Sequence, residues 1–470
     1  MTRQRVIISI YDDETNPYYA GGGPAVVRRI ATALAGEYDV TVITAGKRFA
    51  RKEIGSISYV YLPVLIAGGR GSQVLWGMTL PFVALFASYA LWLESFNPPF
   101  SSNFVPWVTR RPVIGLAQSL SARVMATRYR ISFPLWLEAR LLRRYRDIIV
   151  LNDHDAEVVR RTSPQTQVHV ITNWVEMPKI SITDAKDGRY AVFLGRIDVG
   201  MKGLDLLMDA YTQHPEGLLP LVIAGRGPKP QEQYLARLIE GSDAPVRWVG
   251  KVNEEGRSGL LDQAALVVVP SREESFSLAA LEALSYGRPV VHFDLPQLAW
   301  IPPGCHTSVP RFDVTALAGA IARYSRDPVR RSEEGHRAYD FAQRFNQISR
   351  SRYLELVNSR IYQRVTLRPA RIVRRGVLRT ARIGGQLPHQ IPGQGVQHPD
   401  QLVPHQHPGR PDLGPVHRPE QSPGHRRNPF PVLRRCRETQ RVGDIFPTRE
   451  ARRGVDASHQ HGGRTVARGQ

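Results

Sequence analysis

The chain is 470 residues long, carries a formal net charge of +21 and is 42% hydrophobic. This length allows roughly three domains, and the apolar content is sufficient for large cores. The charge is uneven, because residues 361–470 contain 20 arginines, no lysine and seven acidic residues and so carry +13 of the total. The preceding residues are only mildly basic, which argues against nucleic-acid binding as the function.

The cysteine content predicts a reducing environment. Cys305 and Cys436 are the two cysteines of the chain, and they lie far apart in the sequence. Two distant cysteines do not form a disulfide framework, and the apolar run 6–10 is shorter than the core of a signal peptide. We therefore expect a cytoplasmic protein.

Short apolar strands alternate with helical patterns from residue 1 to about 175. The first expected strand, 6–10, is followed by the glycine cluster 21–23 and an amphipathic helix that ends near Ala35. Further strands are expected at 38–44, 90–94, 112–116, 148–151 and 168–171. Because buried strands separated by helices form parallel sheets covered on both faces, this pattern predicts a first α/β domain over 1–175.

An uncharged stretch within this region, 74–93, has the length of a membrane-spanning helix. It contains Pro81 and several small or polar residues, and periodicity alone does not separate a buried helix from a span. We interpret it as a buried or surface-seeking helix up to about Ala87, followed by the strand at 90–94.

The same alternation restarts after a polar stretch, 178–188, which has the composition of a linker. Strands are expected at 190–195, 219–225, 246–250, 265–270 and 289–293, with closing helices from about 314 to 357. This predicts a second α/β domain over 176–360. Two such domains form a cleft, and open α/β sheets bind ligands at the carboxyl ends of their strands.

Residues 361–470 have a different composition, in which Gly, Pro, Gln, His and Arg dominate and hydrophobic periodicity disappears. Such a segment cannot bury enough apolar surface to offset its ordering entropy, so we expect a disordered basic tail. A basic arm for acidic surfaces and a metal-binding histidine tract are alternatives. The loss of lysine is also typical of out-of-frame translation of GC-rich DNA, a hypothesis that resequencing the gene would test.

The strongest chemical signal is the segment 271–284, after the expected strand 265–270. Glu274 is expected on the loop at the carboxyl end of that strand, and Glu282 on the following helix. Ser277 and Leu278 would open this helix, whose unpaired N–H groups and positive dipole end suit phosphate oxygens. The carboxylates would then accept sugar and ribose hydroxyls. The alternative is that they only complement the helix dipole and face solvent.

Two weaker signals precede it. The segment 195–203 follows a strand, and the planar fork of Arg196 with the point charge of Lys202 suits a diphosphate without a metal. The alternative is a pair of solvated surface cations. Gly225 belongs to the glycine turn 224–228, which follows the next strand and is uninformative by itself.

Taken together, these motifs resemble glycosyltransferase family 4, the glycosyl transferases of group 1, which are retaining enzymes with the GT-B fold. The resemblance covers about 1–350 and is strongest over 190–292. It implies two facing Rossmann-like domains with a cleft, and a nucleotide sugar held by the C-terminal domain. It also implies the roles of four residues: Arg196 and Lys202 bind the diphosphate, Glu274 contacts the transferred sugar, and Glu282 contacts the ribose.

The N-terminal half resembles the family in two places. The loop that contains Gly22 and Gly23 resembles the glycine loop that lies near the donor phosphates and the acceptor. The sequence Asn173-Trp174-Val175 resembles the Asn-Gly-Val of the hinge between the domains.

The chain also departs from the family pattern. Glycines are usual where Ser275 and Ser277 stand, and many members have a histidine where Gln118 stands. Glutamine donates a hydrogen bond to a sugar hydroxyl but does not take up a proton. We therefore assign Gln118 to substrate binding rather than to acid–base catalysis.

The resemblance implies transfer of a hexose from a nucleotide-diphosphate sugar to a glycan or lipid-linked acceptor, as in polysaccharide biosynthesis. Glu274, Arg196 and Lys202 are the candidate catalytic residues, and neither a metal nor another cofactor is expected. An Asp-x-Asp sequence, 153–155, is interpreted as the cap of the next helix rather than as a metal site.

Two other functions stay open: a catalytically silent GT-B-like subunit that binds a nucleotide sugar, and a sugar epimerase or phosphorylase on the same fold. A dinucleotide dehydrogenase is disfavoured because no Gly-x-Gly-x-x-Gly follows Ile10. The apolar stretch 74–87 would suit peripheral contact with an anionic membrane, together with Arg110, Arg111, Arg123, Arg128 and Arg130. The alternative is an ordinary buried helix with solvated charges.

Overall fold

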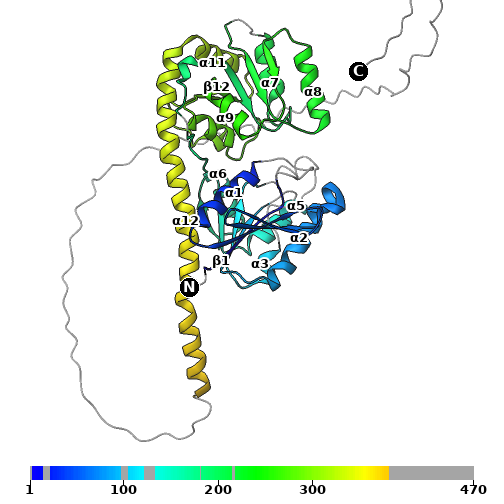
Figure 1. The fold of residues 1–470 in the computed structure, drawn as a ribbon, viewed down its shortest axis with the longest axis vertical. Helices are drawn as coiled ribbons and strands as arrows, with labels where there is room; N and C mark the ends of the chain where they lie inside the picture. The colour runs from blue at the N-terminus through cyan, green and yellow to red at the C-terminus, as the bar shows by residue number, and fades with distance from the viewer. Residues whose placement is uncertain are drawn as a thin grey trace, which may run out of the picture. The chain divides into compact units, whose positions relative to one another are not determined.

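The computed structural model describes residues 3–13, 22–96, 104–120, 133–179, 181–213 and 217–380. Residues Met1–Gln386 belong to one compact unit. It contains two β-sheets with helices packed against them (Figure 1). The predicted boundary between 175 and 176 falls between the last strand of the first sheet and the first strand of the second.

The first sheet has eight strands in the order β3-β4-β2-β1-β5-β6-β7-β8. Their bounds are β1 Arg5–Ile10, β2 Asp39–Ala45, β3 Ala50–Ile54, β4 Ile57–Leu62, β5 Leu91–Ser95, β6 Val113–Ala117, β7 Asp147–Val150 and β8 Gln167–Val170. All neighbouring pairs are parallel except β3 with β4. This edge hairpin was not predicted, because β3 is mostly charged and exposed and gives no apolar run.

Helices cover the first sheet on both faces. Alternate residues of β1 point to opposite sides, so that Val6 and Ile8 pack with α1 and α12, whereas Ile7 packs with α2. The helices of this half are α1 Gly23–Leu34, α2 Gly68–Phe86, α3 Val105–Val108, α5 Phe133–Leu142 and α6 Asp153–Thr162, with the 3-10 helix η1 Leu65–Ala67.

The stretch 74–93 forms the second half of α2 and part of β5, as the sequence predicted. The helix begins earlier than expected, at Gly68, and contains Pro81. Within the described residues, no helix is long and apolar enough to cross a membrane.

The second sheet has six parallel strands in the order β11-β10-β9-β12-β13-β14. They are β9 Tyr190–Leu194, β10 Leu221–Ala224, β11 Val246–Trp248, β12 Ala264–Val269, β13 Val290–Phe293 and β14 His306–Val309. The surrounding helices are α7 Leu204–Gln213, α8 Lys229–Glu240, α9 Glu254–Asp262, α10 Leu278–Ser285 and α11 Val314–Arg326, with η2 Ala185–Asp187 and η3 Pro296–Leu298.

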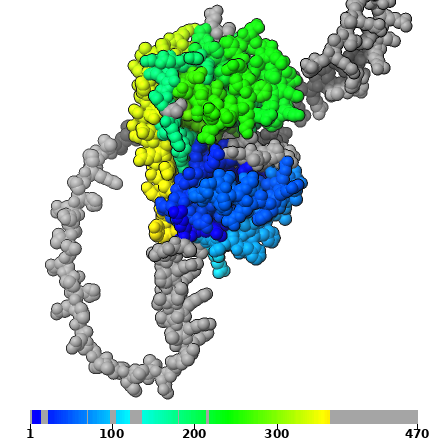
Figure 2. All heavy atoms as spheres, in the orientation of Figure 1, coloured from blue at the N-terminus to red at the C-terminus, as the bar shows by residue number. Residues whose placement is uncertain are grey.

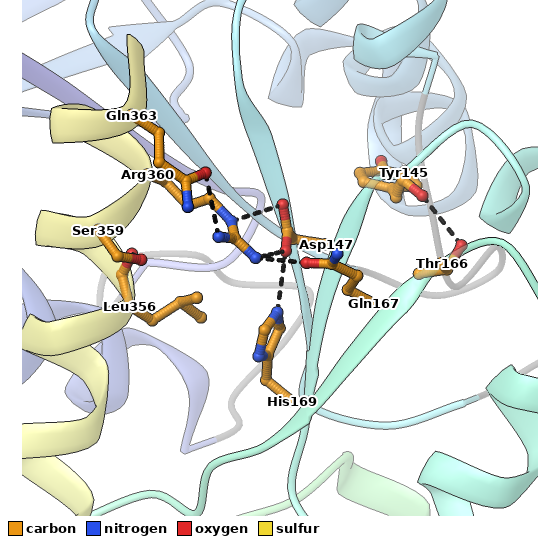
Figure 3. Close-up of polar contacts among 9 residues, drawn as sticks. All are labelled: Tyr145, Asp147, Thr166, Gln167, His169, Leu356, Ser359, Arg360 and Gln363. Atoms are coloured by element: carbon orange, nitrogen blue, oxygen red, sulfur yellow. Dashed lines mark hydrogen bonds and ion pairs between the residues drawn. The ribbon is translucent and has the colours of Figure 1, made fainter. Parts of the chain in front are cut away.

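A long helix, α12 Pro328–Thr380, contacts both halves of the unit (Figure 1). It lies against α10 and α11 near its start and against α1 and β5 farther along. Arg360 then forks onto the buried Asp147 of β7, with Nε 3.0 Å from Oδ2 and Nη2 2.6 Å from Oδ1 (Figure 3). His169 of β8 contacts the same carboxylate at 2.9 Å.

This anchor also determines a charge state. Burial alone would raise the pKa of Asp147, but the hydrogen bonds from His169 and Arg360 hold its pKa below the ordinary value. Ile361, next to this anchor, is still buried, and the helix ends at Thr380. The predicted start of the tail at 361 stays a prediction, and residues 381–470 lie outside the described residues.

Candidate active site

The predicted site residues of the second sheet lie where the strand order reverses. Strands β9 and β12 are direct neighbours, although β10 and β11 lie between them in the chain. The loop after β9 carries Arg196 and Lys202, and the loop after β12 carries Glu274. Because the carboxyl ends of parallel neighbours meet at one edge, the two loops lie side by side, at the position where open α/β sheets bind ligands.

Lys202 and Glu274 form a direct ion pair across these loops. The Lys202 Nζ is 2.6 Å from Glu274 Oε1, and the Ser271 hydroxyl donates to the same oxygen at 2.7 Å. The Glu274 side chain is 9% exposed and that of Lys202 is 20% exposed. The structure therefore brings together two of the three predicted catalytic residues.

The glycine after Lys202 makes this approach possible. Gly203 has φ +63, and a Cβ atom there would lie 1.9 Å from the carbonyl oxygen of Pro270. A side chain at 203 would push the two loops apart, so glycine is required for packing.

Arg196 lies on the same loop but is more exposed. Its Nη2 is 3.6 Å from Asp198 Oδ2 and 3.5 Å from the sulfur of Met201. The side chain is 32% exposed, so a ligand can engage it at small desolvation cost. Sequence reasoning missed Arg272, which forks onto Asp205 of α7 with two 2.7 Å bonds. Its Nη1 also donates to the Gly200 carbonyl at 2.7 Å and so joins the two loops.

Gly225 has a structural reason to be glycine. A Cβ atom at this position would lie 1.7 Å from the carbonyl oxygen of Gly195, at the start of the loop that carries Arg196. The Trp248 indole donates to the Gly225 carbonyl at 3.1 Å. The turn thus packs against the start of the loop that carries Arg196. The assignment of Gly225 to substrate binding stays a prediction.

Helix α10 opens where the sequence predicted. Ser277 is its N-cap, and its hydroxyl accepts a hydrogen bond from Ala280 N at 3.3 Å. Its backbone is left-handed, with φ 61 and ψ 86. Glycine adopts this conformation without strain, which explains why a glycine is usual at this place in the family that the motifs resemble. The first turn carries no acidic side chain, so the positive end of the helix is uncompensated.

The glycine loop of the first sheet lies against this helix mouth. A Cβ atom at Gly22 would lie 2.5 Å from Leu278 Cδ1, and Leu278 packs against core residues of both halves. Gly22 is also the N-cap residue of α1, and Gly23 is its first residue. Two helix N-termini therefore meet at this point, while Gly21 lies outside the described residues.

Glu282 is buried and engaged by arginines from both halves. Arg257 Nη1, on α9, donates to its two oxygens at 3.0 and 3.1 Å. Arg29 Nη2, on α1, lies 3.7 Å from Oε1. No local motif marks these arginines, because each reaches Glu282 only through packing of separate helices.

Gln118 pairs with the predicted hinge. The Asn173 side-chain amide donates to Gln118 Oε1 at 3.0 Å. The adjoining Val175 N–H donates to Asn346 Oδ1 of α12 at 2.9 Å. Gln118 thus follows β6 and is held by the segment that leads from the first sheet to the second.

The interpretation of 153–155 needs one correction. The cap of α6 is Asn152, whose Oδ1 accepts from Asp155 N at 2.8 Å, while Asp153 and Asp155 occupy the first turn. The Asn152 amide also donates to Ser275 O at 2.9 Å, and burial raises the pKa of Asp155. Among the described side chains, no group of three His, Cys, Asp or Glu is placed to hold a metal. Metal independence stays a prediction.

Comparison with known proteins finds a family match within the second half. Residues 188–327 match the family model "Glycosyl transferases group 1". The chain is 31% identical over 174 residues to phosphatidyl-myo-inositol mannosyltransferase of Mycobacterium leprae, which is 35% of this chain and 46% of that protein. It is 28% identical over 285 residues to the enzyme of that name from Propionibacterium freudenreichii, 55% of this chain and 69% of that protein. It thus spans about half the length of the first of these relatives.

Solved structures share the fold. Sucrose-phosphate synthase from Thermosynechococcus elongatus superposes with a TM-score of 0.63 at 20% identity, covering 77% of this chain and all of that one. Anabaena HepE, solved with UDP and glucose, superposes with a TM-score of 0.59 at 16% identity, covering 76% of this chain and all of that one. These likenesses confirm the GT-B fold. Over residues 188–327, the chain is thus similar to the glycosyl transferases of group 1.

Proposed function

We propose that this protein transfers a hexose from a nucleotide-diphosphate sugar to a glycan or lipid-linked acceptor, with retained configuration and without a metal. The observation that carries the proposal is the Lys202–Glu274 pair, 2.6 Å long, at the reversal point of the second sheet beside the open end of α10. Relatives support it by their names, among them a GDP-mannose:cellobiosyl-diphosphopolyprenol alpha-mannosyltransferase of Xanthomonas campestris, 29% identical over 158 residues.

In this proposal the protein stabilises the departing diphosphate electrostatically. Arg196, Lys202 and the backbone N–H groups at the start of α10 are donors aimed at phosphate oxygens, where negative charge grows as the sugar leaves. Lys202 then turns from Glu274 towards the phosphate. Both contacts to Glu274 go to Oε1, so we expect Oε2 to accept a hydroxyl of the transferred sugar.

Substitutions of the cations test this assignment. Arg196→Ala and Lys202→Ala should each lower turnover at least about tenfold, equivalent to roughly 1.4 kcal/mol in the barrier. Lys186→Ala, which removes an exposed lysine on η2, is the matched control and should leave the rate unchanged. Unchanged rates in both site variants would contradict the proposal.

Glu274→Gln separates a role in transfer from a role in folding. It keeps the shape of the side chain but removes the charge that Lys202 contacts. Transfer should fall more than nucleotide binding, and an equal loss of both would indicate a structural role. Thermal-shift screening with UDP-, GDP- and ADP-sugars identifies the donor. Donor hydrolysis or transfer by the purified chain excludes a silent subunit, and dependence on orthophosphate would indicate a phosphorylase.

For the acceptor, we propose contact with an anionic membrane through the outer face of α2. The exposed apolar residues of this helix recur at intervals of four, from Val74, 53% exposed, through Met78 and Phe82 to Phe86, 88% exposed. An exposed apolar stripe of this kind suits the headgroup–acyl boundary of a membrane.

The neighbouring helices add aromatic and cationic groups. Helix α3 packs beside α2 and presents Trp107, whose ring lies 4.5 Å from the guanidinium of Arg144 and 5.8 Å from that of Arg140. Such amphipathic pairs favour an anionic interface. Of the arginines named from the sequence, Arg111 packs over Tyr89 instead. Residues 123, 128 and 130 lie outside the described residues.

Flotation of the full chain with vesicles tests this surface. The native protein should float with vesicles that contain an anionic phospholipid at low salt, and less so with neutral vesicles. Phe82→Ser combined with Phe86→Ser should reduce flotation. Phe49→Ser, at an exposed phenylalanine beside β3, is the control. All variants keep the basic C-terminal residues, so a difference between them reports on α2. If the native chain does not float with anionic vesicles at low salt, the proposed membrane contact is refuted.

A further inference from the structure

Glu282 receives a positive charge from each half of the compact unit. Arg257 lies on α9, next to the second sheet, and its Nη1 donates to both carboxylate oxygens. Arg29 lies on α1, next to the first sheet, and contributes an ion pair at 3.7 Å without a hydrogen bond. Two guanidinium groups around one carboxylate give this cluster a net charge of about +1.

The position of Arg29 is unfavourable for the unliganded protein. Its side chain is only 19% exposed, and among the described residues its buried Nη1 has no hydrogen-bond partner. Burial lowers the pKa of Arg29, and only the charges of Glu282 and Glu176 oppose this. Arg257 already donates to both oxygens of Glu282, so this carboxylate has a hydrogen-bonded partner without Arg29. A buried donor left unpaired calls for another explanation, and function is one.

The contact depends on how α1 and α10 lie against each other. These helices meet first at their N-termini, where Gly22 touches Leu278. Arg29 is two turns farther along α1, and Glu282 is one turn farther along α10. The charge of Arg29 therefore reaches Glu282 only when the glycine loop of the first sheet rests on the helix mouth that forms the proposed phosphate site.

We propose that Arg29 is a positioning residue for the donor. It acts through Glu282, whose carboxylate receives the ribose hydroxyls. The orientation of this carboxylate therefore depends on whether α1 and α10 are in contact. The proposal rests on the proposed function, because its ligand is a nucleoside diphosphate. Arg29 keeps the Glu282 carboxylate oriented as ribose hydroxyls donate to it, and it does so from the opposite half. Donor binding and docking of the glycine loop are coupled in this way.

A double-mutant cycle tests the coupling. Arg29→Gln should weaken binding of UDP or GDP, whichever the native full-length chain binds, at least about fivefold by titration calorimetry. Arg28→Gln, next to it on the same helix, is the control and should stay within about twofold. In a Glu282→Gln background, Arg29→Gln should add less than about twofold, because its route to the ligand is gone.

A merely structural role would give a different result. The melting temperature without ligand should change little in Arg29→Gln, whereas the increase on adding UDP or GDP should shrink. Arg29→Lys keeps the charge and should recover most of the affinity. Equal losses in the native and Glu282→Gln backgrounds, or no recovery in Arg29→Lys, would overturn the inference. A native chain that binds no nucleoside diphosphate refutes the proposed function itself, whereas native binding with an unaffected Arg29→Gln refutes only the role of Arg29.

Discussion

The backbone of Ser277 predicts an unusual order of stabilities. With φ 61 and ψ 86, this serine adopts a left-handed conformation that costs a residue with a Cβ atom about 1–2 kcal/mol. Glycine avoids this cost. It loses a few tenths of a kcal/mol of capping and about 0.4–1 kcal/mol through the greater freedom of the unfolded chain. Ser277→Gly should therefore change the free energy of unfolding by about 0 to +1 kcal/mol.

Alanine neither avoids the left-handed strain, as glycine does, nor caps the helix, as serine does. Ser277→Ala keeps the left-handed strain and loses the hydroxyl that accepts from Ala280 N, a cap worth about 0.5–2 kcal/mol. The alanine variant should therefore be less stable than the glycine variant by about 2 kcal/mol. For a chain of this size, that corresponds to a difference of several degrees in melting temperature.

Urea unfolding measures the difference. Trp300 donates its indole N–H to the Phe276 carbonyl at 3.0 Å, so tryptophan fluorescence includes a reporter beside this turn. Ser275→Gly is the matched control, because Ser275 is not among the non-glycine residues with positive φ and gains nothing from glycine. If Ser277→Ala is as stable as Ser277→Gly, or if the two glycine variants are equally stable, backbone strain at residue 277 does not determine the stability of this turn.

Three further predictions follow from buried groups. Burial lowers the pKa of His292 from 6.5 to about 4, so the unfolded chain takes up a proton first. The free energy of unfolding should fall by about 3 kcal/mol as the pH falls from 6.5 to about 4, and it should stay level above 6.5. A His292→Asn variant should show a flatter dependence of the urea midpoint on pH. Arg360→Gln leaves Asp147 with His169 alone and should cost about 3 kcal/mol, measured as a lower urea midpoint. Gly203→Ala would place a methyl group against a backbone carbonyl and should cost at least about 2 kcal/mol, measured in the same way.

Periodicity and loop composition were sufficient to predict most of the second half. Strands β9, β10 and β12 are short, continuous apolar runs, because parallel strands covered on both faces bury nearly every side chain. The loops after them carry the motif residues, so the sequence also located Lys202, Glu274 and the start of α10. The charged edge strand β3 was not predicted, because an exposed edge strand needs no apolar run.

The partners of those residues were decided by the tertiary structure alone. The sequence placed Glu282 on a helix, but only helix packing brings Arg29 and Arg257 to it. Likewise, the sequence placed Arg360 after the last expected helix, at the end of the second domain, and did not indicate the buried Asp147 that it reaches. Local patterns depend on neighbours a few positions away, and so they predict elements and loops. Ion pairs between separate elements depend on how the sheets and helices pack, and no local pattern records that arrangement.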